Sequence, residues 1–109
     1  MQTFNIDTFK GGWFVGPFKE TAFSTSACEV AYKTHSAGDA WDTHYHAFAD
    51  EINYLISGKM KINGQLLVAP VVFVIAKGEV AGPEFITDVS MIVVKVPGVL
   101  NDKIVVQTV

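Results

Sequence analysis

The chain has 109 residues, half of them hydrophobic and 17% charged, which is enough apolar material to bury one core. Its charged side chains are eight lysines and eleven carboxylates, with no arginine, and the formal net charge is −3. This balance argues against nucleic acid as a main partner, because phosphate binding needs a basic face.

Short apolar stretches separated by turn residues run along the whole chain, and none shows the period of an amphipathic helix. The segments with strand character are, in chain order, residues 13–15, 27–33, 43–47, 51–57, 59–62, 66–68, 71–76, 91–96 and 104–106. The pair Asn63-Gly64 between two of them is the strongest short signal for a β-hairpin. Strands this short and closely spaced predict a single all-β domain over residues 1–109, a sandwich or a barrel.

The cellular compartment is suggested by features that the chain lacks. The single cysteine, Cys28, cannot form a disulfide within the chain, which fits a reducing environment. The first residues show no signal-peptide pattern, and the longest wholly apolar run, residues 71–76, is too short to cross a bilayer. We therefore expect a cytoplasmic protein with no membrane partner.

Two histidines and a glutamate form the cluster with the clearest chemistry. His44 and His46 are two residues apart, so their side chains share one face of a strand. If residues 47–50 turn the chain, Glu51 returns beside both imidazoles. Two imidazoles and one carboxylate are a donor set for a divalent ion with open positions, and iron(II), manganese, nickel and zinc all suit it. An isolated His-x-His pair is more often a surface accident, so the surrounding residues matter.

The spacing around this cluster is that of a known motif. From Gly38 to Gly58 the sequence follows G-x5-H-x-H-x4-E-x6-G, with every fixed position filled. It resembles the first conserved motif of the cupins, small β-barrels built as a double-stranded β-helix. The strand pattern resembles a cupin over nearly the whole chain. The resemblance implies that His44, His46 and Glu51 are metal ligands, that Gly38 lets the chain enter the strand, and that Gly58 occupies the turn after the glutamate strand.

The second cupin motif, usually G-x5-P-x-G-x2-H-x3-N, is degenerate over residues 70–85. Gly78 alone matches, and Ala81 stands where the family has a histidine as fourth ligand. Three interpretations remain open. The site keeps three protein ligands and open positions, a nearby carboxylate (Glu79 or Glu84) replaces the histidine, or the barrel no longer binds metal. We favour the first two, because two imidazoles and a carboxylate in one cavity are costly without a cation or hydrogen-bond partners.

Other residues have simpler explanations. We expect His35 to be an exposed histidine at a loop or strand end rather than an acid or base, and Cys28 to be a small buried apolar residue. Tyr45 and Tyr54 should face away from the cavity, because they alternate with the proposed ligands along their strands. Residues 101–103 are interpreted as a polar turn.

Residues 1–22 form an N-terminal extension that holds Trp13, Phe14 and Phe18 among several glycines. A small barrel offers such an apolar segment an exposed sheet edge to pair with. The cupin resemblance implies a homodimer in which this extension pairs or packs across the two subunits. Capping of the edge within one subunit is the simpler alternative.

Two classes of function follow. The resemblance implies a metal-dependent enzyme of the dioxygenase, isomerase or lyase type that acts on a small molecule. The lack of arginine, and of a lysine cluster near His44 and His46, favours a neutral or weakly polar substrate. The alternative is a non-catalytic cupin that binds or senses a metabolite, with or without metal, because one fold hosts many functions. No general base beyond the metal site is apparent in the sequence.

Overall fold

The computed structural model describes residues 1–107, which contain eleven strands and two short 3-10 helices. The helices are η1 (Ile6–Thr8) and η2 (Lys10–Gly12), and neither is long enough to cross a membrane. The strands are β1 (Trp13–Gly16), β2 (Phe23–Ser24), β3 (Glu29–His35), β4 (His44–His46), β5 (Asp50–Ser57), β6 (Lys59–Ile62), β7 (Gln65–Val68), β8 (Val71–Ile75), β9 (Pro83–Phe85), β10 (Val89–Val96) and β11 (Lys103–Val105).

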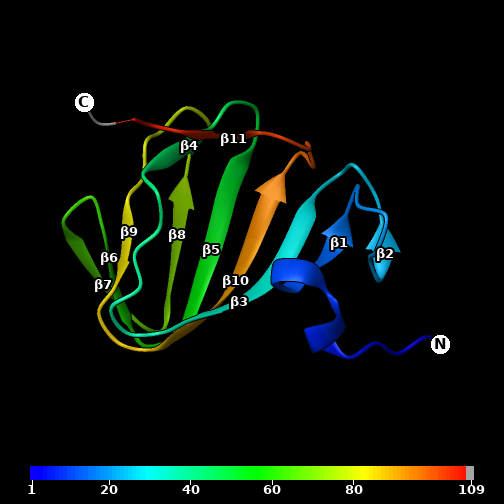
Figure 1. The fold of residues 1–109 in the computed structure, drawn as a ribbon, viewed down its shortest axis with the longest axis horizontal. Coiled ribbons are helices and arrows are strands. Elements are labelled where there is room, and N and C mark those ends of the chain that lie inside the picture. The colour runs from blue at the N-terminus through cyan, green and yellow to red at the C-terminus, as the bar shows by residue number, and fades with distance from the viewer. Residues whose placement is uncertain (108–109) are drawn as a thin grey trace.

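The strands form one large sheet and two small ones (Figure 1). The large sheet has the order β2-β1-β3-β10-β5-β8, and β10 pairs antiparallel with both β3 and β5 at its centre. The small sheets have the orders β7-β6-β9 and β11-β4. In Figure 1, β4 and β11 cross one end of the large sheet, near the start of β5. The chain is thus an all-β double-stranded β-helix, as the sequence predicts.

Alternation along the central strands separates a buried face from an outer face. On β10, Val89, Met91 and Val93 are buried, whereas the residues between them are half-buried. These side chains pack with Leu55 and Met60 in the main hydrophobic core. The core lies toward the end of the sheet where β5 turns into β6. The opposite end, near β4 and β11, is left for polar residues.

Most predicted strands are present with shifts of one or two residues at their ends, and β6 has the predicted bounds, residues 59–62. Two strands were not predicted, β2 and β9, because each has only two or three residues and β9 begins at a proline. Cys28 lies just before β3 rather than inside it, and its side chain is half-buried instead of fully buried.

Gly58 occupies the tight turn between β5 and β6, at the place that the first motif predicts. Its φ is +93°, and a side chain there would collide with the carbonyl oxygen of Asp88. Gly38, in the loop between β3 and β4, also has a positive φ, +87°, but open space surrounds it. Backbone geometry therefore favours glycine at both ends of the motif, most strictly at Gly58.

The N-terminal extension covers an edge of the large sheet within its own chain. Strand β1 pairs antiparallel with β3, with Trp13 opposite Ala31, and β2 pairs parallel with β1. This pairing corresponds to capping within one subunit. Exchange of the extension between two subunits stays a prediction.

Candidate metal centre and cavity

His44, His46 and Glu51 come together at the β4 end of the barrel. One ligand atom from each residue lies within 4.8 Å of the other two. Strand β4 presents both imidazoles on one face, and residues 47–50 turn the chain so that Glu51 enters β5 beside them. The Nε2 atom of His46 lies 3.0 Å from Oε2 of Glu51. The local spacing therefore produces the predicted cluster.

His44 is held as the neutral tautomer with its proton on Nδ1, which leaves Nε2 free to bind a metal ion. Its Nδ1 lies 2.7 Å from the carbonyl oxygen of Asp42, so Nδ1–H donates and Nε2 carries the free lone pair. Burial lowers the pKa of His44, and the opposing effect of the Asp42 hydrogen bond does not restore its usual value. The neutral imidazole is therefore favoured.

Glu51 is held in its charged form. Burial alone would raise the pKa of this carboxyl group, but hydrogen bonding and charge interaction with His46 outweigh burial and hold the pKa below its usual value. The nearby Asn53 amide acts in the same direction, although its Nδ2 makes no hydrogen bond of ordinary geometry within residues 1–107. An anionic oxygen thus faces the two imidazoles.

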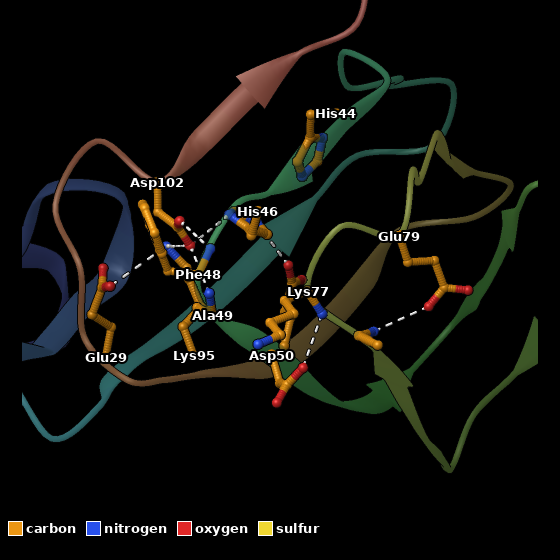
Figure 2. A network of polar contacts seen from close by, with 12 residues as sticks. Glu29, His44, His46, Phe48, Ala49, Asp50, Lys77, Glu79, Lys95 and Asp102 are labelled. Atoms are coloured by element: carbon orange, nitrogen blue, oxygen red, sulfur yellow. Dashed lines mark hydrogen bonds and ion pairs between the residues drawn. The ribbon is translucent and has the colours of Figure 1, made fainter.

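A second carboxylate, Asp102, lies behind His46 and was not identified from the sequence (Figure 2). It is only 2% exposed, so residues 101–103 are more than the polar turn that the sequence suggested. Its oxygens accept the backbone N–H groups of Phe48 and Ala49, at 2.7 and 3.1 Å. These bonds fix the turn that leads to Glu51. No local pattern marks Asp102, because its partners are distant in the sequence.

Asp102 also belongs to a row of buried charges that ends at the metal cluster. Its Oδ2 lies 3.7 Å from Nδ1 of His46 and 4.0 Å from Nζ of Lys95. Lys95 in turn lies 3.4 Å from Glu29, whose Oε2 accepts the backbone N–H of Val99. Charges alternate along the row, which lowers the cost of burying each one.

The donor set fits a divalent metal ion. His46 Nδ1 is buried and has no hydrogen-bond partner among residues 1–107, although Asp102 is its nearest charged neighbour. If His46 held an ion through Nε2, its ring proton would stay on Nδ1, on the side of the Asp102 carboxylate. Metal-bound histidines commonly have a carboxylate or carbonyl at their other nitrogen. His44 follows this arrangement with the Asp42 carbonyl at 2.7 Å, whereas His46 has the Asp102 carboxylate at 3.7 Å, beyond hydrogen-bond distance.

The two candidate replacements for the fourth ligand lie elsewhere. Glu79 accepts the backbone N–H of Ala76 at 3.0 Å and closes its own turn, away from both imidazoles (Figure 2). Glu84 is exposed on β9, where its neighbours Pro83 and Phe85 face the cavity instead. Neither glutamate lines the cavity, so the expectation that one of them replaces the histidine is not supported.

Ala81, at the position of the missing histidine, does face the cavity. It is 3% exposed and pairs with His44 through two backbone hydrogen bonds of 2.8 and 3.0 Å. The degenerate motif therefore places a methyl group where the family pattern places an imidazole. The room that this substitution leaves lies directly beside His44.

The cavity next to the cluster has a volume of about 310 Å³, near the lower end of the roughly 300–1,000 Å³ typical of small-molecule sites. Most of its walls are apolar. They include Trp41, Met60, Phe73, Phe85, Met91 and Val93. Tyr45 and Tyr54 do not line it, as predicted.

Two expectations about the cavity were wrong. His35 does end a strand, but it is half-buried in the wall, with its ring stacked 4.1 Å from that of Phe85. Lysines are also present, since Lys33, Lys95 and Lys103 all line the cavity. Lys103 lies directly opposite His46 in the pairing of β11 with β4. Strand pairing brings these charges to the histidines although the sequence separates them.

No family model and no curated protein matches the sequence. Solved structures do resemble the fold. An uncharacterised protein with a double-stranded β-helix domain from Klebsiella pneumoniae is 17% identical, with 98% of this chain and 93% of that chain covered and a TM-score of 0.74. A protein of unknown function with a cupin-like fold from Ralstonia eutropha is 14% identical, with 88% and 61% covered and a TM-score of 0.65.

The chain has a cupin-type fold. An acetylacetone dioxygenase from Acinetobacter johnsonii also resembles it, at 18% identity and a TM-score of 0.60, with 77% of this chain and 62% of that chain covered. At these identities the likeness establishes the fold of the cupin-type domain and leaves its chemistry to its own residues.

Proposed function

We propose that this cupin-type domain binds one divalent metal ion through His44, His46 and Glu51 and acts on a small molecule in the adjoining cavity. The observation that carries this proposal is the approach of the three donor groups to within 4.8 Å of one another. Iron(II), manganese, nickel and zinc all accept two imidazoles and a carboxylate. When bound, such an ion supplies Lewis-acid or redox chemistry.

The surrounding residues orient the ligands and exclude water. The Asp42 carbonyl orients the His44 ring, and Asp102 faces the far nitrogen of His46. The apolar walls favour a substrate with an apolar or weakly polar body. Solved neighbours of this fold include a dioxygenase, which is consistent with a metal-dependent enzyme of the dioxygenase, isomerase or lyase type.

The second candidate is a non-catalytic cupin that binds or senses a metabolite. Ala81 in place of the fourth ligand favours it, because a site with fewer protein ligands holds its ion less firmly. Measurement of oxygen uptake and substrate loss with the metal-loaded protein separates the two candidates. Turnover of any small molecule supports the enzyme, and stoichiometric binding without turnover supports the sensor.

Metal content of the purified protein tests the proposed site directly. We expect about one ion per chain by elemental analysis and a large loss in His44→Ala and in His46→Ala. His35→Gln is the matched control, because it removes the third histidine, which lies outside the three-residue cluster. Absence of bound metal under every loading condition would overturn the proposal, as would equal metal content in all variants.

We also propose a homodimer in the cytoplasm, as the sequence suggests. The outer face of the large sheet supports a subunit contact, because Val72 and Val74 on its edge strand β8 are 61% and 59% exposed. Light scattering on a sizing column gives the mass. A value of twice 11.9 kDa is expected, and a monomer at all concentrations would contradict it.

A further inference from the structure

Among residues 1–107, two lysines in the cavity wall, Lys33 and Lys103, have no carboxylate partner within 4.0 Å. Within residues 1–107, every ion pair of 4.0 Å or shorter involves His46 or Lys95. Lys33 and Lys103 are therefore unpaired, although the chain has eleven carboxylates. Burial, followed by the positive charge of Lys103, lowers the pKa of Lys33. The two ammonium groups thus repel each other, and no ion pair of 4.0 Å or shorter among residues 1–107 offsets either charge.

Trp41 holds both ammonium groups at the cavity. Lys103 Nζ lies 4.7 Å from the centre of the indole ring, and Lys33 Nζ lies 5.7 Å from it. Lys33 also lies 5.1 Å from the ring of Trp13. Contacts with aromatic rings orient a cation, but they do not neutralise it. Both charges therefore remain available to an anion in the cavity.

The carboxylates on the neighbouring elements already form ion pairs or hydrogen bonds with other groups. Glu29 and Asp102 face Lys95, and Glu51 faces His46. Asp39, in the loop after β3, accepts the backbone N–H of Ser36. Lys33 and Lys103 are therefore the two lysines of the cavity wall that have no ion-pair partner within 4.0 Å among residues 1–107.

We propose that the ligand of this cavity is a small carboxylic acid with an apolar body, whose carboxylate binds between Lys33 and Lys103. The inference deepens the proposed function, since it concerns the same cavity, but it does not depend on the metal. It replaces the neutral or weakly polar substrate that the sequence suggested, because that expectation rested on the lack of arginine and also on the lack of a lysine cluster near the histidines, and the cavity does contain lysines. A carboxylate suits the site better than a phosphate, since the chain has no arginine for a bidentate clamp and the remaining walls are apolar.

Two probes that differ mainly in charge measure how much the carboxylate contributes to binding. Hexanoate and hexanamide have nearly the same size and shape, so the ratio of their dissociation constants reports the preference for the anion. Tryptophan fluorescence follows both titrations, because Trp13 and Trp41 line the cavity. We expect hexanoate to bind more tightly by about tenfold or more at low salt, with the ratio falling as salt is added.

Lysine variants test whether Lys33 and Lys103 cause the preference for hexanoate over hexanamide. In the double variant Lys33→Gln/Lys103→Gln the ratio should fall to near one, and Lys61→Gln, an exposed lysine on β6 outside the cavity, should leave it unchanged. The single variant Lys103→Gln removes an exposed side chain and keeps the test usable if the double variant does not fold. Failure of both probes to bind, equal binding of the two, or a preference that survives the double variant would overturn the proposal.

Two further experiments distinguish the lysine site from binding of the anion to the metal and from a phosphate site. The titrations are repeated after chelation of any metal, and a preference that persists there supports the lysine site even if the metal proposal fails. A preference that disappears on chelation, yet survives the lysine variants, would place the anion on the metal and overturn this proposal. Inorganic phosphate is added as a competitor, and displacement of hexanoate at equal or lower concentration would identify a phosphate site instead.

Discussion

At the scale of single residues, the metal cluster depends on a carboxylate that is not a ligand. Asp102 accepts the backbone N–H groups of Phe48 and Ala49 and also faces Nδ1 of His46. One side chain thus fixes both the turn before Glu51 and the surroundings of an imidazole. An asparagine at this position would lose the charge and also one of the two acceptor oxygens, so it affects both roles.

We expect Asp102→Asn to weaken metal binding by about 10–100-fold, because the carboxylate behind a ligating histidine is lost. Competition with a chromophoric chelator measures the affinity. Asp39→Asn is the matched control, since Asp39 also accepts a backbone N–H but lies outside the cluster. Unchanged affinity in Asp102→Asn would show that neither the charge nor the second acceptor oxygen of Asp102 supports metal binding.

We expect His35 to make the stability of the fold depend on pH. Burial, followed by the charge of Lys33, lowers the pKa of His35 below its usual 6.5, and Asp39 only partly opposes this. The unfolded chain therefore binds a proton at a higher pH than the folded chain does. The free energy of unfolding should decrease as the pH falls through 6.5 toward the lower folded pKa, and this effect should level off below it.

Urea unfolding at about pH 7.5 and about pH 5 measures this effect. We expect His35→Gln to lose less stability than the unmodified protein over that interval. Some pH dependence should remain, because the pKa of His44 is lowered as well. Identical losses in the two proteins would show that His35 does not contribute.

At the scale of elements, strand alternation and one turn assemble the site. Strand β4 presents two imidazoles on one face. On β5, Glu51 and Asn53 line the cavity, and Leu55, on the same face, lies in the core. The same alternation leaves Tyr45 and Tyr54 outside the cavity. The β5–β6 turn at Gly58 then sends the chain into the second sheet.

Gly58→Ala should reduce the free energy of unfolding by roughly 1–3 kcal/mol, because a positive φ and a backbone collision combine there. Gly64→Ala is the comparison variant, since Gly64 has a φ of +81° but open space around it. We expect a smaller loss for Gly64→Ala in urea unfolding. Equal losses would mean that φ alone sets the cost.

At the scale of the whole molecule, the two faces of the large sheet serve different purposes. The inner face carries the core and the cavity, and the outer face exposes apolar residues on β5 and β8. Tyr54, Ile56, Val72 and Val74 are all exposed there. An apolar sheet face of this kind is typical of a contact with another protein chain.

We expect Val72→Lys/Val74→Lys to convert the proposed homodimer into a monomer, because charge on this face opposes its burial. Both side chains are exposed in one subunit, so the fold should tolerate the changes. Leu66→Lys, an equally exposed position on β7, is the control. A dimer that persists in the double variant would contradict a contact through this face, and the N-terminal extension would then be the next candidate.

The sequence by itself determined the features that depend on short spacing. The strands follow from alternation and turn residues, and the cluster of His44, His46 and Glu51 follows from a strand, a turn and the start of the next strand. These features need only neighbouring residues, and local backbone geometry is sufficient to place them. The motif position of Ala81 was also found in this way, and the structure places that residue beside His44.

Only the tertiary structure decided which distant charges surround that cluster. Pairing of β11 with β4 brings Lys103 opposite His46, and the loop before it carries Asp102 to the same place. Lys33 reaches the cavity from β3, whereas Glu79 and Glu84 lie outside it although they belong to the degenerate motif. These placements arise from strand pairing between segments far apart in the chain. The physical reason is that side-chain spacing along one strand does not encode which strand lies beside it.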